Sequence, residues 1–106
     1  MVREVTPREF EAARRAGADA VLLDVREEWE LKVASVPGIV HIPMGQVAAR
    51  LGELDPARET VVLCRSGRRS LEVARFLEQQ GFRSVANLSG GILAWSRDLD
   101  PSIPEY

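Results

Sequence analysis

Several residue types are scarce in this sequence, and each shortage excludes a class of site. The 106 residues include one cysteine (Cys64), one histidine (His41) and one lysine (Lys32). A single cysteine cannot form an internal disulfide, and with one histidine it does not supply the ligand spacing of a zinc site. We therefore expect a reducing, cytoplasmic location, and we expect neither a metal nor a cofactor.

Long hydrophobic runs are also missing. No stretch approaches the roughly 18 apolar residues of a membrane helix, and the N-terminal segment MVREVTPREFEA lacks the apolar core of a signal peptide. The formal net charge is −2, so the molecule has no general attraction to nucleic acid or to an anionic membrane. We expect neither partner, and any anion site must be local.

The sequence does contain an alternation of helix and strand patterns. Thr6, Pro7 and Glu9 form a capping-box signature for a helix that Gly17 ends. Apolar runs predict strands at 20–25, 39–42, 60–64 and 84–88, and helical patterns follow at 26–33, 44–54, 68–80 and 90–99. We predict one α/β domain over residues 1–106, with a central parallel sheet of about five strands and helices on both faces.

Two further expectations concern packing. Trp29, in the charged segment 26–33, is assigned to packing. The final segment, 100–106, contains two prolines and is expected to be a docked or frayed end.

The cysteine lies where such a fold binds ligands. In open parallel sheets ligands bind beyond the C-terminal ends of the strands, and both Asp24 and Cys64 fall at strand ends. Three arginines follow Cys64 closely, and a helix begins a few residues later. Arginine charges and the helix N-terminus favour thiolate over thiol, and we expect solvent to reach this sulfur. The alternative is a small buried core residue among ordinary surface charges.

The loop length indicates the chemistry. His41 lies in VHIP and is expected to be a strand or loop residue rather than a general base. An activated thiolate could attack a phosphoryl group or the outer sulfur of a donor such as thiosulfate. Cysteine phosphatases place an arginine after cysteine and five residues, to clamp phosphate oxygens, but this position is Ser70 here. This residue count therefore favours attack on a sulfur donor over attack on a phosphoryl group.

Four segments resemble the rhodanese family in its single-domain form, and together they cover nearly the whole chain. They are LLDVREEWE (22–30), VPGIVHIPM (36–44), VVLCRSGRRS (61–70) and LSGGILAW (88–95). The resemblance implies a rhodanese-like fold and a ping-pong sulfurtransferase reaction, in which Cys64 accepts sulfane sulfur as a persulfide and passes it to an acceptor.

The resemblance also assigns roles to residues. Cys64 would be the catalytic nucleophile, and Asp24 and Arg26 would support its loop together with Ser70, although Asp24 is equally consistent with a cap on the following helix. Gly90, Gly91 and Trp95 match architectural positions. The residues that would bind the anionic donor or the persulfide are Arg65, Ser66, Gly67, Arg68 and Arg69.

Two departures from the family pattern affect these expectations. The family histidine of the Gly-His-Ile-x-Gly-Ala segment is replaced by Ser35, which leaves donor preference open. No second cysteine can resolve the persulfide, so the acceptor must be external: cyanide in vitro, or a thiol or sulfur-carrier protein in the cell. The alternatives are a non-enzymatic interaction module and a cysteine-based phosphatase or arsenate reductase.

Overall fold

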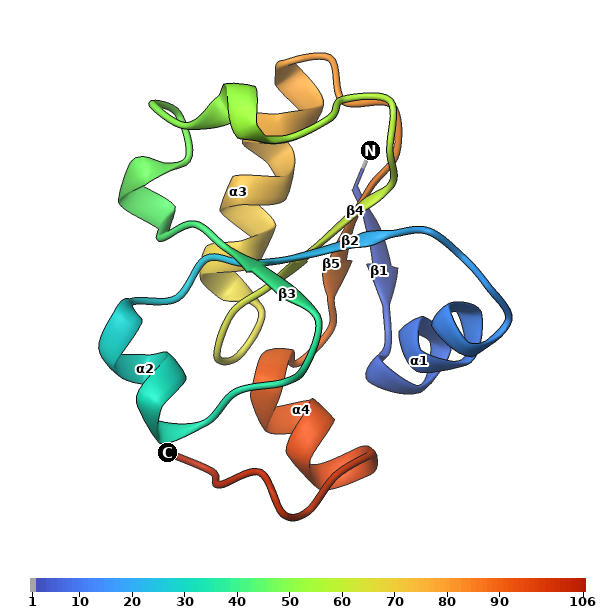
Figure 1. Cartoon of the computed structure of the whole chain (residues 1–106), viewed down its shortest axis with the longest axis vertical. Helices are drawn as coiled ribbons and strands as arrows, with labels where there is room; N and C mark the ends of the chain where they lie inside the picture. Colours follow the sequence, from blue (N-terminus) through green and yellow to red (C-terminus); the bar gives the residue numbers. More distant parts are fainter. Residues whose placement is uncertain (1) are drawn as a thin grey trace.

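A computed structural model describes residues 2–106 as a five-stranded sheet covered by four α-helices (Figure 1). Two short 3-10 helices, η1 and η2, lie between the third and fourth strands. The elements in chain order are β1 (Arg3–Val5), α1 (Pro7–Arg15), β2 (Val21–Asp24), α2 (Glu28–Val33), β3 (Ile39–His41), η1 (Met44–Gln46), η2 (Leu51–Glu53), β4 (Thr60–Leu63), α3 (Arg68–Gln79), β5 (Val85–Leu88) and α4 (Gly91–Asp98).

All strand pairs are parallel, and the strand order is β1-β5-β4-β2-β3. The predicted α/β class with a parallel sheet is confirmed. Asp24 pairs with Leu63 in the register of β2 and β4, so the two strands end side by side. Cys64 follows Leu63 directly and therefore lies at the C-terminal edge of the sheet, on its central strand.

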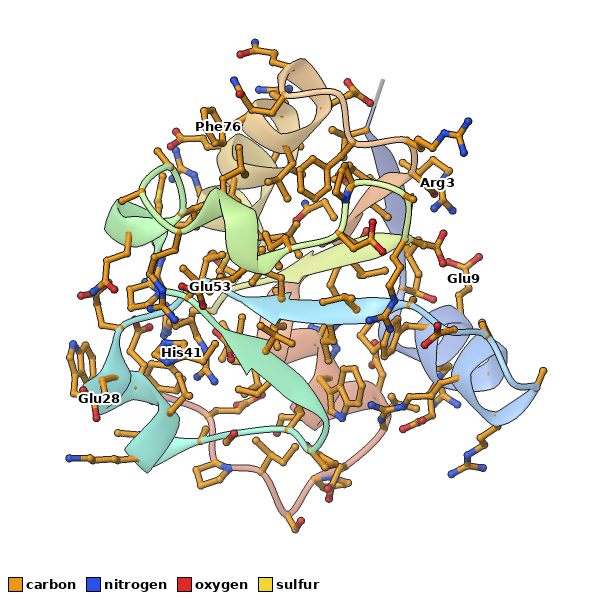
Figure 2. All side chains as sticks on the ribbon, turned by 45° about the horizontal axis from the view of Figure 1, so that its top comes forward. Arg3, Glu9, Glu28, His41, Glu53 and Phe76 are labelled. Carbon is orange, nitrogen blue, oxygen red and sulfur yellow. The ribbon has the colours of Figure 1, made fainter. Side chains whose placement is uncertain are left out.

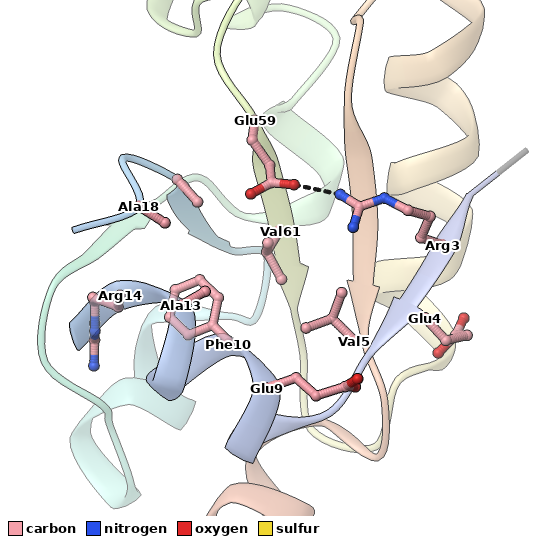
Figure 3. Close-up of a pocket in the computed structure, with 11 residues that line it drawn as sticks. Arg3, Glu4, Val5, Glu9, Phe10, Ala13, Arg14, Ala18, Glu59 and Val61 are labelled. Carbon is pink, nitrogen blue, oxygen red and sulfur yellow. Dashed lines mark hydrogen bonds and ion pairs between the residues drawn. The ribbon is translucent and has the colours of Figure 1, made fainter. Parts of the chain in front are cut away.

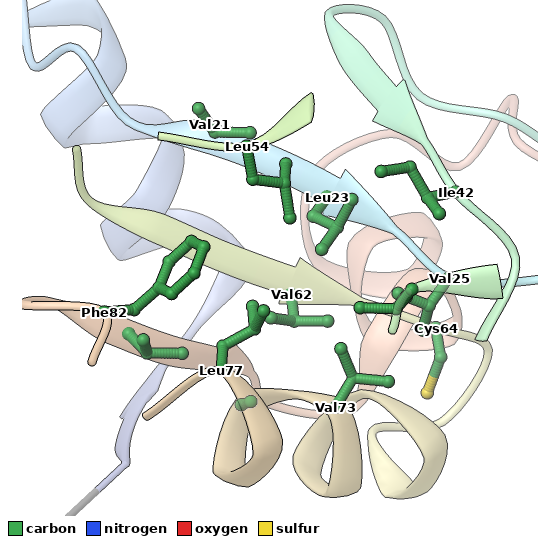
Figure 4. Close-up of a cluster of buried hydrophobic side chains, with 13 residues drawn as sticks. Val21, Leu23, Val25, Ile42, Leu54, Val62, Cys64, Val73, Leu77 and Phe82 are labelled. Atoms are coloured by element: carbon green, nitrogen blue, oxygen red, sulfur yellow. The ribbon is translucent and has the colours of Figure 1, made fainter. Parts of the chain in front are cut away.

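Each face of the sheet carries its own hydrophobic core. On one face Leu23 and Val62 contact Val73 and Leu77 of α3, and Cys64 belongs to this cluster (Figure 4). On the other face Phe10 of α1 and Trp95 of α4 cover the sheet, their rings 5.9 Å apart. Helices thus cover both faces, as predicted, because strands buried on both sides are apolar throughout.

Several local predictions are confirmed. Thr6 caps α1: its hydroxyl accepts the Glu9 N–H at 3.1 Å, and the Glu9 carboxylate accepts the Thr6 N–H at 2.9 Å. Trp95 is buried, as predicted. The final segment is docked rather than frayed, since Ile103 is buried and Tyr106 forms hydrogen bonds to residues far away in the sequence.

Two predictions are wrong. Residues 44–54 form η1, η2 and turns instead of one α-helix; Gly45 and Gly52 interrupt this segment, and glycine disfavours a helix by about 1 kcal/mol relative to alanine. Trp29 is 61% exposed instead of buried, because α2 turns this side chain outward, where its ring makes an edge contact with the Tyr106 ring. In addition, the short strand β1 was not recognised. Among the described residues, no helix has the length and apolar character needed to cross a membrane.

Candidate active site

The turn between β4 and α3 holds the cysteine sulfur at the start of a helix. Gly67 is the N-cap of α3 and has φ +101°, a conformation that other residues rarely adopt. Its backbone N–H donates to Cys64 Sγ at 3.0 Å. Figure 4 shows the sulfur turned toward the first turn of α3. The helix N-terminus, with its unpaired N–H groups and partial positive charge, therefore lies beside the sulfur.

Buried polar side chains surround the sulfur from the other side. Ser70 Oγ lies 3.2 Å from Cys64 Sγ, and it also contacts Asn87 Oδ1 of β5 at 2.5 Å. Asn87 Nδ2 donates to the Gly67 carbonyl at 3.1 Å. Sequence reasoning missed Asn87. It is the one polar side chain within the apolar run of β5, and a polar residue in such a run indicates a buried hydrogen-bonding site.

The sulfur is buried, contrary to the expectation that solvent reaches it. Cys64 is 1% exposed, and Ser70 is fully buried beside it. The reason is the tightness of the turn, which brings the Gly67 N–H and the Ser70 hydroxyl into contact with the sulfur. Arg65, Ser66 and Arg68 are exposed outside it. Reaction at Sγ therefore requires the turn to admit the reacting atom.

The three loop arginines have different surroundings. Arg69 forms two hydrogen bonds of 2.8 Å each with the Glu30 carboxylate of α2. Arg65 Nε donates to the main-chain oxygen of Tyr106 at 2.5 Å, and its guanidinium lies 5.2 Å from the Tyr106 ring centroid. Arg68 is exposed and has no partner among residues 2–106. It is thus the loop arginine free to meet an anion.

Glu30 is a second polar centre that sequence reasoning missed. The Arg69 guanidinium lowers the pKa of Glu30 to about 2, although burial of the carboxyl acts in the opposite direction. The Tyr106 hydroxyl donates to Glu30 Oε1 at 2.8 Å and accepts from Arg26 Nη1 at 2.9 Å. Burial raises the pKa of Tyr106. This network holds the final segment of the chain against the cysteine turn.

Asp24 and Arg26 form a fully buried ion pair. Arg26 Nη2 donates to Asp24 Oδ2 at 2.8 Å, and the Arg26 backbone N–H donates to Asp24 Oδ1 at 3.0 Å. Asp24 does not cap α2, because Glu27 is its N-cap residue. The pair contacts the cysteine turn indirectly, through Tyr106. His41 lies on β3 (Figure 2), and its Nε2 is 2.7 Å from the Arg26 carbonyl, so it serves the same framework.

The glycine pair Gly90 and Gly91, at the N-cap and first position of α4, brings a second helix start against the turn. The N–H groups of Ile92 and Leu93 donate to the carbonyls of Cys64 and Arg65, at 2.9 and 3.2 Å. A Cβ at Gly91 would lie 2.4 Å from the Arg65 oxygen, and the residue has φ +59°. Only glycine permits this approach.

One cavity of the structure lies away from the cysteine turn. It has a volume of about 460 Å³ and is lined by residues of β1, α1 and the start of β4, including Phe10 and Val61 (Figure 3). The Arg3–Glu59 ion pair lies at its rim. None of its lining residues belongs to the cysteine turn, so this cavity is separate from the candidate site.

Comparison with known proteins identifies this arrangement. The family model "Rhodanese-like domain" matches residues 6–98. The chain belongs to the rhodanese family. Its rhodanese-like fold has the cysteine turn at the end of the central strand, where the family resemblance predicted it. The four segments that carried the resemblance are therefore parts of one fold.

Several rhodanese-like proteins match along most of the chain. A "Sulfurtransferase" of Allochromatium vinosum is 35% identical over 92% of this chain and 91% of its own length. A chloroplastic "Rhodanese-like/PpiC domain-containing protein 12" of Arabidopsis thaliana is 46% identical over 83% of this chain, but the match spans only 31% of that protein.

A solved structure gives the same assignment. The "Thiosulfate sulfurtransferase" of Pseudomonas aeruginosa superposes with a TM-score of 0.81 at 30% identity, covering 91% of this chain and 19% of that one. Sulfur transfer is the class of activity that these relatives indicate for the rhodanese-like chain.

Proposed function

We propose that the protein transfers sulfane sulfur from an anionic donor such as thiosulfate, through a Cys64 persulfide, to a thiophilic acceptor. The observation that carries the proposal is the placement of Cys64 Sγ at the start of α3, under the Gly67 N–H at 3.0 Å, with the unpaired Arg68 as the first residue of this helix. A helix N-terminus and an arginine favour a sulfur anion and an anionic donor at the same point.

The reaction balances in two steps. The Cys64 thiolate attacks the outer sulfur of thiosulfate; the new Sγ–S bond forms as the S–S bond of thiosulfate breaks, and its electron pair leaves on sulfite. The negative charge of the protein then resides on the outer sulfur of the persulfide. An acceptor such as cyanide attacks this sulfur, thiocyanate leaves, and the thiolate is regenerated. The helix N-terminus supports the anion in both states.

Arg68 is the side chain proposed to bind the sulfonate end of the donor. Arg65 and Arg69 are held by Tyr106 and Glu30, and moving either one would break these contacts. Arg68 can form charge-assisted hydrogen bonds with sulfonate oxygens without such a loss. The acceptor must be external, since Cys64 is the one cysteine of the sequence: a thiol or a sulfur-carrier protein in the cell.

The phosphatase alternative has less support. Cysteine phosphatases have a phosphate-clamping arginine at the position that Ser70 occupies here. The Ser70 hydroxyl is buried and bound to Asn87, and a serine offers no guanidinium to clamp phosphate oxygens. An interaction module without activity would need no polar contacts to the sulfur, yet Gly67 and Ser70 both make them.

The test measures sulfur on Cys64 directly. Incubation with thiosulfate should add about 32 Da, one sulfur atom, to the intact protein, and cyanide should remove it as thiocyanate. Cys64→Ser should abolish both the mass shift and thiocyanate formation. A wild-type protein that gains no sulfur, or a Cys64→Ser variant that keeps full activity, would contradict the proposal. Because Cys64 is buried, the donor should be small, and bulky thiol reagents should react slowly.

A further inference from the structure

Asn87 is a buried polar residue whose contacts lead directly to the sulfur. It lies on β5 and is 3% exposed. Its Nδ2 donates to the Gly67 carbonyl at 3.1 Å and to the Glu4 carboxylate oxygens at 3.2 and 3.3 Å. Glu4 is itself fixed by the Ser89 hydroxyl, which donates to it at 2.7 Å. Asn87 Oδ1 lies 2.5 Å from Ser70 Oγ.

These partners determine which way each proton points. A carbonyl and a carboxylate only accept hydrogen bonds, so the amide nitrogen of Asn87 must face them and the amide oxygen must face Ser70. The amide oxygen cannot donate, and therefore the Ser70 hydroxyl donates to Asn87. A hydroxyl has one proton. Ser70 consequently turns a lone pair toward Cys64 Sγ, 3.2 Å away.

A lone pair at this distance distinguishes the states of the sulfur. A thiol can donate its S–H to Ser70, and the inner sulfur of a persulfide carries no charge. A thiolate meets the lone pair of Ser70, unless the hydroxyl turns to the sulfur and leaves the buried amide oxygen of Asn87 unpaired. An unpaired buried acceptor costs free energy. Asn87 Oδ1 and Cys64 Sγ therefore compete for the single proton of the Ser70 hydroxyl.

We propose that Asn87 is a positioning residue that withholds the Ser70 proton from Cys64 and thereby favours the states in which Sγ is uncharged, above all the persulfide. The inference rests on the proposed function for its biological meaning. During sulfur uptake the negative charge moves from Sγ to the outer sulfur, away from the Ser70 lone pair. Glu4, on the first strand, sets the orientation of the amide.

The other charges near the sulfur do not depend on Asn87. Arg69 interacts electrostatically with Cys64, which raises the pKa of the guanidinium, but the hydrogen bonds that Arg69 donates to Glu30 are the larger cause. Asp24, the last residue of β2, is paired with Arg26. Arg65 lies on the turn itself, and Arg68 is the first residue of α3. An Asn87 substitution leaves all of these in place, so a change in sulfur reactivity comes either through Ser70 or through the contact of Asn87 with the Gly67 carbonyl.

The test uses alkylation of Cys64 by iodoacetamide, followed from about pH 5 to pH 9. Asn87→Leu has a similar shape and no acceptor, so the Ser70 hydroxyl becomes free to donate to the sulfur. On the acidic limb of the rate–pH profile, Asn87→Leu should be alkylated about ten times faster than wild type. A tenfold change corresponds to the low end of the free energy that a hydrogen bond to a charged group contributes. An unchanged profile overturns the proposal.

A double variant separates proton competition from simple loosening of the turn. Ser70→Ala removes the proton for which Asn87 and the sulfur compete, so adding Asn87→Leu to it should change the profile less than twofold. An equal tenfold rise in both backgrounds would indicate loosening and overturn the proposal. If Asn87→Leu does not fold, Glu4→Ala provides the test: about a twofold rise is expected, and none overturns it.

Sulfur loading gives a second readout. At a fixed ratio of thiosulfate to sulfite, intact mass should show a severalfold lower sulfurated fraction in Asn87→Leu than in wild type, whereas an equal fraction counts against the proposal. Alkylation needs no sulfur donor. A wild type that gains no sulfur would therefore reject the proposed function, while the alkylation profiles would still decide the role of Asn87.

Discussion

The two helices that begin beside Cys64 have similar starts but use them differently. Both α3 and α4 follow a glycine in the left-handed conformation, Gly67 with φ +101° and Gly90 with φ +75°, and neither has a side-chain cap. At α3 the N-cap N–H points at the cysteine sulfur. At α4 the first N–H groups bind the carbonyls of Cys64 and Arg65. One helix start supports the reacting atom, and the other fixes the turn that carries it.

The largest expected effect comes from separating α4 from the turn. Gly91→Ala places a Cβ 2.4 Å from the Arg65 oxygen at φ +59°, and it should lower the free energy of unfolding by about 3 kcal/mol or more. Gly81→Ala is the matched control: its φ is +90°, but no atom lies within 4 Å of the added Cβ. We expect about 1 kcal/mol there. Urea unfolding measures the free energy of unfolding of both variants. Equal losses would show that the close contact of Gly91 with the turn adds no cost to the substitution.

The next effect concerns the ion pair that holds the first turn of α3. Glu30→Gln should destabilise the protein at neutral pH by about 1–3 kcal/mol, discounted because Arg69 is partly exposed. The folded pKa of Glu30 is lowered from 4.5 to about 2. Its stabilisation is therefore present above pH 4.5 and is lost as the pH falls toward 2. Unfolding curves of wild type and variant should converge over this interval, and a difference independent of pH would contradict the ion-pair explanation.

A smaller effect would sharpen the role of the free arginine at the start of α3. Arg68→Ala should reduce kcat/KM for thiosulfate about five- to tenfold, or roughly 1–1.4 kcal/mol, and should leave a neutral polysulfide donor nearly unaffected. Arg75→Ala, another exposed arginine of α3, is the control and should change neither. Equal losses with both donors would exclude Arg68 from binding the sulfonate.

Much of this arrangement could be predicted because its signals are local. The capping box of Thr6 and Glu9 predicted the first helix, the apolar runs predicted four of the strands, and the segment after Cys64 predicted a short turn into a helix. Each of these depends on a few neighbouring residues. The order of the strands, β1-β5-β4-β2-β3, is not encoded in any of these patterns.

The rest depends on contacts that no local pattern encodes. Tyr106 binds Arg26 and Glu30 across 80 and 76 positions of sequence, and Asn87 binds Glu4 across 83. The pairing of two loop arginines is a result of such contacts, since Arg69 binds Glu30 across 39 positions and Arg65 binds Tyr106 across 41. Trp29 was misplaced for the same reason: a hydrophobic side chain on a short helix is buried only if another element covers it.

The central position of β4 ties sulfur reactivity to the cohesion of the whole sheet. Its backbone is paired on both sides, with β5 and β2, and the Val25 N–H donates to the Leu63 carbonyl at 3.0 Å, one residue before the cysteine. Amide protons of such a strand exchange with deuterium only when the sheet comes apart. Slow exchange at Val61 and Val62 should therefore disappear in the same denaturant range in which the thiol becomes open to large reagents.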